Sequence, residues 1–408
     1  MFYIKCYNIR STFQWKGCNN SMKQSERELV LKIIAAIVLF SVFSLYGCTG
    51  PEEKEQGIKD NKGFVKIAAI LPLSGPKGYL GEEEKKAIEL AVKEINIKKN
   101  REIIQVIFAD SKENPAEAAI VAARLLNMDK VSAFITSTTS ISRAALPIAT
   151  NNKRLITVLC LDPTIQSMSP YAFRLYESMA DEARQLVEYY SKTGKGKKVV
   201  ILYLNHREII NQVTNYLIPE FMQEGIDVIY YEPYDLMEKD FKAKIDRLKL
   251  SGANSLMIVG FGYEYLPILK ELAQQKLTGK IEITGGWGFL VSNKLPAEFV
   301  EGAIVASPRY VFQKNEKARL FEEKFTKTYG HAPNLDAAFA YDSVNIFAEG
   351  LIQGLIEKQG NADTVSFIIT NHKYDGVMGE VSVDNEGGLI VPMGLGVIKQ
   401  GKILPYNK

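Results

Sequence analysis

Short apolar runs alternate along the chain with segments whose apolar residues recur at helical spacing. The runs Val65–Leu71, Ile103–Phe108 and Leu155–Leu159 predict strands. Between them, Glu82–Asn96 and Pro115–Met128 predict helices, the second with a proline in its first turn. Strands that are apolar throughout and are separated by helices indicate parallel sheets covered on both faces.

The stretch Ala133–Ala149 joins an apolar strand to a helix predicted over Ser142–Asn151. Between the two lie five consecutive hydroxyl residues: Thr136, Ser137, Thr138, Thr139 and Ser140. A helix N-terminus carries unpaired N–H groups and a partial positive charge, so hydroxyls gathered there suit an anionic group such as a carboxylate. Helix capping alone would explain one or two of them. We therefore predict a binding loop at this position.

The same alternation repeats in the second half of the chain. Strands are predicted at Val199–Tyr203, Val228–Tyr231, Leu256–Val259 and Ile281–Thr284, with helices at 211–224, 241–250 and 266–275 between them. Two such ladders, joined near Phe173–Ser178, predict two similar lobes. Two more helices follow at 316–329 and 336–354. The alternating segments Gly379–Val383 and Val391–Ile398 then predict a closing hairpin.

The N-terminal region departs from this pattern. An apolar core of 11 residues follows Lys32, which is short for a membrane span and typical of a signal peptide. Leu45, Gly47 and Cys48 resemble a lipobox, in which Cys48 would become the lipid-modified first residue. An uncleaved N-terminal anchor is the alternative. Either interpretation places the body of the protein outside the cytoplasm, tethered to a membrane.

We interpret residues 1–48 as an upstream extension plus a lipoprotein signal peptide, with translation starting at Met22, and residues 49–63 as a flexible tether. Residues 1–48 hold six Lys and Arg against two Asp and Glu. The rest of the chain then has 44 basic and 45 acidic residues, a net charge of −1. This balance gives no reason to expect a nucleic-acid partner.

Enzyme signatures are absent from the sequence. His206, His331 and His372 stand alone, without a second ligand at metal spacing, and neither a P-loop nor a Gly-x-Ser-x-Gly elbow occurs. Beyond Cys48 the only cysteine is Cys160, which excludes a disulfide within that part of the chain. We therefore expect no catalysis, no metal and no cofactor.

Ligands of parallel sheets lie beyond the carboxyl ends of the strands, and this rule selects particular loops. Their candidate binding residues are Tyr79, Leu80, Ser137, Thr138, Thr139, Cys160, Leu161, Glu208, Phe261 and Trp287. Aromatic residues that face hydroxyls across a cleft suit a small molecule with an anionic end and an apolar body. Packing between the lobes is the alternative role for each aromatic residue.

Several segments, in order and spacing, resemble one family. They are Val65–Pro76, Gly81, Ala87, Ala91, Ile95-Asn96, Asp110 with Pro115, the Ser137–Ser140 loop, Phe173-Arg174, Glu238–Phe241 and Ala340–Ser343. This pattern is similar to the branched-chain amino-acid type of periplasmic binding protein, the type I substrate-binding proteins of ABC importers. It covers nearly all of residues 64–400.

The resemblance implies an α/β fold of two Rossmann-like lobes with parallel central sheets, joined by a multi-strand hinge and closing on a ligand. We expect lobe 1 to hold residues 64–176 and 308–378, and lobe 2 residues 177–307 and 379–408. It further implies a monomer that passes a small molecule to an ABC permease and ATPase complex. The alternative is an envelope lipoprotein that uses the same fold for ligand sensing or for regulating another protein.

Departures from the family bear on the ligand. The hydroxyl loop resembles the family's carboxylate cradle, whereas Leu161 stands where amino-acid binders tend to place a threonine that holds the α-ammonium. Trp287 stands where such binders offer an acidic partner for the ammonium. We therefore expect a carboxylate-bearing ligand without an α-ammonium, such as an organic or aromatic acid or an amide. Glu208 could restore an ammonium partner, which keeps amino acids as the alternative.

Overall fold

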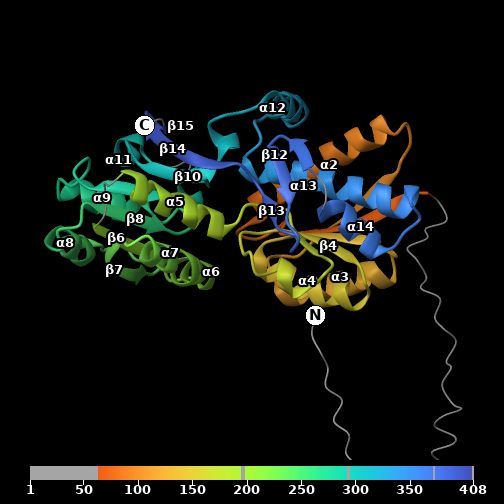
Figure 1. Cartoon of the computed structure of the whole chain (residues 1–408), viewed down its shortest axis with the longest axis horizontal. Coiled ribbons are helices and arrows are strands. Elements are labelled where there is room, and N and C mark those ends of the chain that lie inside the picture. The colour runs from red at the N-terminus through yellow and green to blue at the C-terminus, as the bar shows by residue number, and fades with distance from the viewer. Residues whose placement is uncertain (1–62, 194–197, 292–294, 371–372, 407–408) are drawn as a thin grey trace, which may run out of the picture. The chain divides into compact units, whose positions relative to one another are not determined.

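The computed structural model describes residues 63–193, 198–291, 295–370 and 373–406 (Figure 1). The predicted signal peptide, Cys48 and most of the tether lie outside this part of the chain. Within it, no helix is both long enough and apolar enough to cross a membrane. All three hydrophobic cores of the structure lie inside the compact unit Gly57–Lys408.

Lobe 1 is built on a five-stranded parallel sheet of order β2-β1-β3-β4-β5. The strands are β1 (Val65–Leu71), β2 (Ile104–Asp110), β3 (Ala133–Ser137), β4 (Leu155–Leu159) and β5 (Ala172–Arg174). One face packs on α2 (Gly78–Lys98) and α13 (Leu335–Leu351), and the other on α3 (Pro115–Asn127) and α4 (Thr139–Asn151). Apolar cover on both faces explains why the strands are apolar throughout.

Lobe 2 is built on a seven-stranded sheet of order β15-β14-β10-β9-β8-β6-β7. Its parallel strands are β6 (Lys198–Leu204), β7 (Asp227–Tyr234), β8 (Ser255–Val259), β9 (Glu282–Gly285) and β10 (Ile304–Pro308). Its helices are α5 (Met179–Thr193), α6 (Arg207–Gln212), α7 (Ile218–Gln223), α8 (Lys242–Leu250), α9 (Leu266–Gln274), α10 (Trp287–Val291) and α11 (Ala297–Val300). A π-helical turn, Val213–Leu217, joins α6 to α7.

The C-terminal segments form a different arrangement from the predicted hairpin. β12 (Gly379–Val383) pairs with β11 (Lys373–Gly376) and β13 (Leu389–Ile390), whereas β14 (Met393–Lys399) pairs with β10 and with β15 (Lys402–Pro405). Val381, Val383 and Leu389 are buried in the lobe 1 core. Residues 379–390 therefore pack with lobe 1, not with lobe 2 as expected, because their apolar side chains find cover there.

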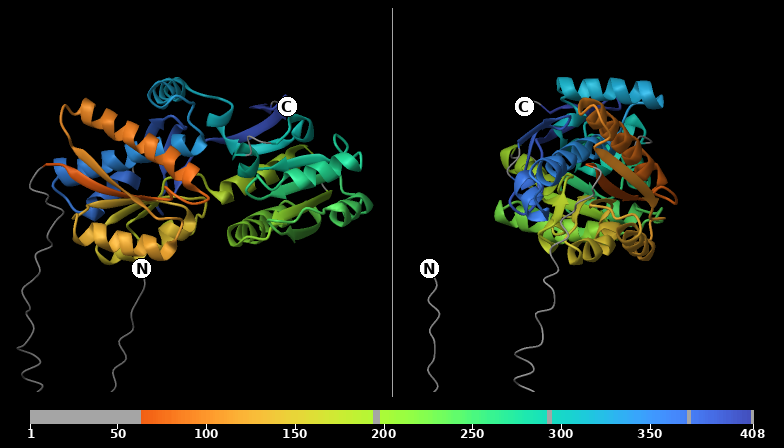
Figure 2. Two further views of the ribbon diagram at one scale, coloured as in Figure 1. Left: turned by 180° about the vertical axis from the view of Figure 1, so that it is seen from behind. Right: turned by 90° about the vertical axis from the view of Figure 1, so that its right-hand side faces the viewer.

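The chain passes between the lobes three times, at residues 174–179, 308–316 and 390–393 (Figure 2). After the second crossing, α12 (Glu316–Tyr329) packs on lobe 1, as does α14 (Ala362–Thr370). The buried guanidinium of Arg174 donates from Nη2 to the Leu389 carbonyl at 3.4 Å and from Nη1 to the Tyr176 carbonyl. This residue thereby ties the first crossing to the third.

Asp342 offers a test of the lobe 1 packing. Its fully buried carboxyl on α13 accepts the N–H groups of Val377 at 3.0 Å and Met378 at 2.8 Å, so it fixes the turn between β11 and β12. We predict that Asp342→Ala lowers the free energy of unfolding by about 2–3 kcal/mol, because two buried donors lose their acceptor. Denaturant unfolding measures the change.

Asp375 on β11 is the matched control. Its carboxyl is exposed and pairs with Lys317 at 3.0 Å, and exposed ion pairs contribute about 0–1 kcal/mol. An equal loss of stability in Asp342→Ala and Asp375→Ala would contradict the anchoring role of Asp342.

Candidate functional site

A cavity of about 580 Å³ lies between the carboxyl ends of the parallel strands of the two lobes. Lobe 1 contributes the segments that follow β1, β3 and β4, and lobe 2 contributes those that follow β6, β8 and β9. The predicted site residues that line it are Tyr79, Leu80, Thr138, Thr139, Cys160, Leu161, Glu208, Phe261 and Trp287. Ser137 does not line it, since this hydroxyl is buried and donates to Glu84 Oε1 at 2.8 Å.

The predicted hydroxyl loop is almost entirely strand and helix. Thr136 and Ser137 end β3, Thr139 and Ser140 begin α4, and only Thr138 lies between. Thr138 has φ 64° and ψ 150°, a conformation that branched residues rarely adopt, and it turns the strand straight into the helix. Its buried Oγ1 has no hydrogen-bond partner among the described residues. The turn therefore places Thr138 and the N-terminal end of α4 at the cavity wall.

The segment after β1 brings Tyr79 and Leu80 to the cavity on the first turn of α2. Asp110 holds this segment in place, because its Oδ1 accepts the Leu73 N–H at 3.0 Å and its Oδ2 accepts the Ser74 hydroxyl at 2.5 Å. Gly81 permits the tight return, since a Cβ atom there would lie 2.2 Å from the Pro72 carbonyl oxygen. Tyr79 is 59% exposed and stands at the open side of the cavity.

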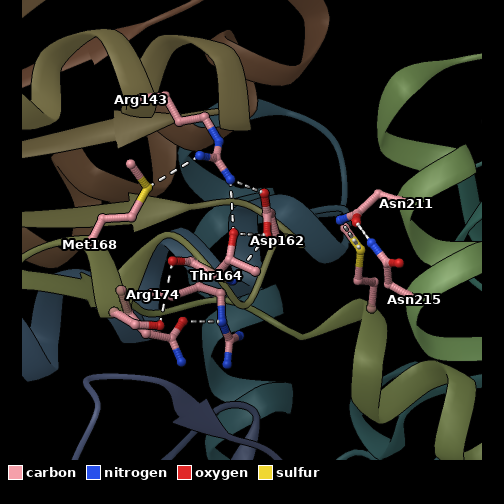
Figure 3. A network of polar contacts seen from close by, with 10 residues as sticks. Arg143, Asp162, Thr164, Met168, Arg174, Asn211 and Asn215 are labelled. Carbon is pink, nitrogen blue, oxygen red and sulfur yellow. Dashed lines mark hydrogen bonds and ion pairs between the residues drawn. The ribbon is translucent and has the colours of Figure 1, made fainter.

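An ion pair behind the cavity orders the segment after β4. Arg143 of α4 donates to Asp162 Oδ2 at 2.7 Å and to Thr164 Oγ1 at 2.8 Å, as Figure 3 shows. Although burial acts to raise it, the hydrogen bonds from Arg143 and Thr164 hold the pKa of Asp162 below its ordinary value. Burial raises the pKa of the neighbouring Cys160 thiol to about 12, so this cysteine is a neutral wall residue.

Lobe 2 presents Trp287 on the backbone after β9. The indole Nε1 is buried and has no hydrogen-bond partner in the described part of the chain. The Trp287 N–H donates to Glu182 Oε2 at 2.7 Å, and Gln212 donates to Glu182 Oε1 at 2.6 Å. A Cβ atom at Gly286 would lie 1.9 Å from Glu182 Cδ, so only glycine lets this backbone reach the carboxyl group. Glu182 and Trp287 form one unit of the wall.

Sequence reasoning missed three buried carboxyl groups on the cavity wall. Glu84 of α2, Asp336 of α13 and Glu182 of α5 are 1%, 2% and 4% exposed. Burial is the main cause that raises the pKa of Glu84 well above its usual range, that of Asp336 to about 6 and that of Glu182 to about 7. In the sequence, Glu82-Glu83-Glu84 has the pattern of a solvated helix face, and nothing local marks the third glutamate as buried.

These carboxyl groups bear on the expected ligand. The expectation of a ligand without an α-ammonium rests on Leu161 and Trp287. The structure places both residues on the cavity wall as expected, but it adds acidic side chains from α2, α5 and α13. The residue types at two positions therefore do not exclude an ammonium group on the ligand.

Comparison with known proteins gives the family. The profile of the periplasmic binding protein family matches residues 65–402, which is most of the chain. The chain belongs to this family. The predicted resemblance and the predicted two-lobed α/β fold with parallel sheets are thereby confirmed. Members of the family bind solutes and are not enzymes.

Relatives of this periplasmic binding protein carry names for amino-acid binding. The chain is 26% identical over 339 residues to Leu/Ile/Val-binding protein homolog 2 of Brucella abortus, covering 79% of this chain and 87% of the relative. It is 23% identical over 332 residues to a leucine-, isoleucine-, valine-, threonine- and alanine-binding protein of Pseudomonas aeruginosa, covering 80% of this chain and 87% of the relative.

Solved structures share the fold while differing in ligand. The LivJ substrate-binding protein of Streptococcus pneumoniae, in complex with isoleucine, gives a TM-score of 0.68 at 22% identity, covering 83% of this chain and 97% of that one. A solute-binding protein of Rhodopseudomonas palustris, in complex with 3,4-dihydroxy benzoic acid, gives a TM-score of 0.72 at 20% identity, covering 85% of this chain and 97% of that one. The two solved structures thus share the fold of this chain but hold different ligands.

The buried carboxyl groups predict a pH dependence of stability. The pKa of Glu182 is raised from 4.5 to about 7 in the folded state, so the folded protein retains a proton that the unfolded chain releases. The free energy of unfolding should therefore fall as pH rises from about 5 to about 8. We predict that over this pH range the free energy of unfolding of Glu182→Gln falls by about 2 kcal/mol less than that of the unsubstituted protein. Thermal and denaturant unfolding across this pH range provide the measurement.

Glu188→Gln serves as the control, because Glu188 lies on the same helix with an exposed side chain that pairs with Lys192. This control should keep the pH dependence of the unsubstituted protein. Equal pH dependence of the free energy of unfolding in Glu182→Gln and Glu188→Gln would contradict the raised pKa of Glu182 in the folded protein.

Proposed function

We propose that this periplasmic binding protein is the extracytoplasmic, lipid-anchored solute receptor of an ABC importer. Its two lobes close on a small carboxylate-bearing solute, such as an amino-acid-like molecule, an organic or aromatic acid, or an amide. The solute is then passed to a permease and ATPase complex. The ten residues predicted from the sequence form the proposed site, with Ser137 acting behind the wall and the other nine on it.

One observation carries the proposal. The Thr138 hydroxyl lies unpaired at the start of α4, where the first N–H groups of the helix lack intrahelical partners. Hydroxyl and N–H donors beside a helix N-terminus suit a carboxylate. The strained backbone of Thr138 supports the same role, because strain of this kind is commonly retained where it positions a functional group.

The wall of lobe 2 supports closure on the solute. Phe261 and Tyr263 stack with ring centroids 6.1 Å apart, and Tyr263 is 64% exposed on the open side of the cavity. Tyr79 is exposed on the opposite lobe. Exposed aromatic surface on two facing walls gains burial when the lobes close on a ligand. Three chain crossings between the lobes offer the hinge for that motion.

Trp287 provides a direct readout of binding. The chain has two tryptophans, Trp15 and Trp287, so residues 57–408 contain Trp287 alone. We predict that a library of amino acids, aliphatic and aromatic acids and amides includes a carboxylate-bearing solute that changes Trp287 fluorescence and raises the melting temperature. Thr138→Ala should weaken that binding about tenfold, the effect of losing about 1.4 kcal/mol from one charge-assisted hydrogen bond.

Ser140→Ala is the matched control. Ser140 lies two residues further along α4, is exposed and does not line the cavity, so its loss should leave the affinity unchanged. Equal affinities of Thr138→Ala and Ser140→Ala would remove Thr138 from the site. If no compound in the library binds, the alternative of a sensory or regulatory lipoprotein is favoured.

A further inference from the structure

Glu177 lies in the first crossing between the lobes, which spans residues 174–179. The residue is 1% exposed, and neither of its carboxyl oxygens has a hydrogen-bond partner among the described residues. Its neighbours Tyr176 and Met179 line the solute cavity, and Ser178 lines a second cavity of about 540 Å³. Glu177 lines neither cavity. A carboxyl group is thus sealed inside a segment that must bend when one lobe moves against the other.

The charged groups that face Glu177 come from both lobes and are mainly acidic. Glu182 and Asp181 lie on α5 of lobe 2, and Asp336 lies on α13 of lobe 1. Burial is the main cause that raises the pKa of Glu177 well above its usual range, and these three carboxyl groups raise it further. Tyr176, the adjacent residue, keeps its phenol protonated, because burial and Asp336 raise the pKa of that phenol. Glu177 therefore holds its proton to a higher pH than an exposed glutamate does.

Arg174, in the same crossing, does not neutralise Glu177. Its positive charge acts to lower the pKa of Glu177, but its guanidinium donates no hydrogen bond to that carboxyl group. The guanidinium donates instead to Gln166 Oε1 at 2.8 Å and to the backbone carbonyls of Tyr176 and Leu389. An ionised carboxylate buried without a partner costs several kcal/mol. Ionisation of Glu177 is therefore unfavourable for as long as the crossing keeps this conformation.

We propose that Glu177 is a proton-controlled switch of the hinge. With its proton, the first crossing keeps the sealed conformation described above. Without it, the crossing moves so that the carboxylate reaches water, and the two lobes change their arrangement. The inference rests on the hinge motion of the proposed function and not on the identity of the solute. The pH outside the cytoplasm would thereby select between arrangements of the lobes, whether or not a solute is bound.

Proton linkage fixes the direction of the change. In the sealed conformation the pKa of Glu177 is raised, whereas the same carboxyl group in water has its ordinary pKa of 4.5. Between these two values, each unit of rising pH multiplies the ratio of water-exposed to sealed conformers by up to about tenfold. Asp336 and Glu182 titrate in the same range, since burial raises their pKa to about 6 and about 7. A substitution at Glu177 itself is therefore needed to assign the effect.

Distance measurements between the lobes test the inference on residues 57–408. Ile120 on α3 of lobe 1 and Met237 after β7 of lobe 2 are exposed, so Ile120→Cys and Met237→Cys can carry spin labels. Cys160, the native cysteine in this range, is buried and its raised pKa protects it from the label. Double electron–electron resonance without solute should give two distance populations whose ratio changes at least tenfold between about pH 5 and about pH 8.

Glu177→Gln removes the titrating group and keeps the shape of the side chain. In the labelled protein, this variant should show the low-pH distance distribution at both pH values, because its amide stays neutral. Glu188→Gln, which changes an exposed carboxyl group on α5, should keep the pH response of the labelled protein. If Glu177→Gln does not fold, Glu177→Met carries the same test, since methionine is neutral, of similar length and needs no hydrogen-bond partner.

The possible outcomes are distinct. A distance distribution that is the same at both pH values, in labelled protein that keeps Glu177, would overturn the inference. An unchanged pH response in the neutral variant at position 177 would overturn it as well. The proposed function survives either result if a compound of the solute library still changes the distance. A distance that responds neither to pH nor to any compound of the library would count against the proposed function and against this inference with it.

Discussion

Parallel strand pairing is the constraint on which the site depends. Each parallel neighbour requires a crossover, so the segments after successive strands gather at one edge of each sheet. In this protein the two edges form the walls of one cavity, and residues as distant in sequence as Thr138 and Trp287 line it together. The side chains that contact a solute can therefore vary while the strands that position them remain apolar.

Three buried carboxyl groups without an oppositely charged partner among the described residues are the second physical feature of the site. Glu84, Asp336 and Glu182 lie beneath the cavity surface, and burial raises the pKa of each. Natural proteins rarely bury several carboxyl groups unless metals, cations or function require it.

Much of the fold follows from sequence pattern, because apolar runs and helical spacing are local signals. Strand Val65–Leu71 and helix Glu316–Tyr329 occur at the predicted boundaries. The C-terminal hairpin was wrong, because pairing between Gly379–Val383 and its neighbours is decided by which core covers Val381 and Val383. Alternation along a strand shows that one face is buried but does not say against which lobe.

Part of the site could also be predicted, because the ends of the strands are visible in the local sequence pattern. The rule that ligands lie beyond strand ends selects Tyr79, Thr138, Cys160 and Trp287, which all line the cavity. It cannot select Glu84 or Asp336, because these residues belong to helices, not to segments that directly follow a strand, and reach the cavity through tertiary packing. The run of five hydroxyl residues predicted a longer loop than the structure has. Thr136 and Ser137 make side-chain hydrogen bonds inside lobe 1, to Ser142 and Glu84 respectively.

The most direct measurement is the chemical identity of the solute that the protein retains when purified from cells, determined by native mass spectrometry and by derivatisation with a carboxylate-reactive reagent. The account predicts a small molecule that carries a carboxylate. A retained solute without a carboxylate would contradict the account of the site at Thr138.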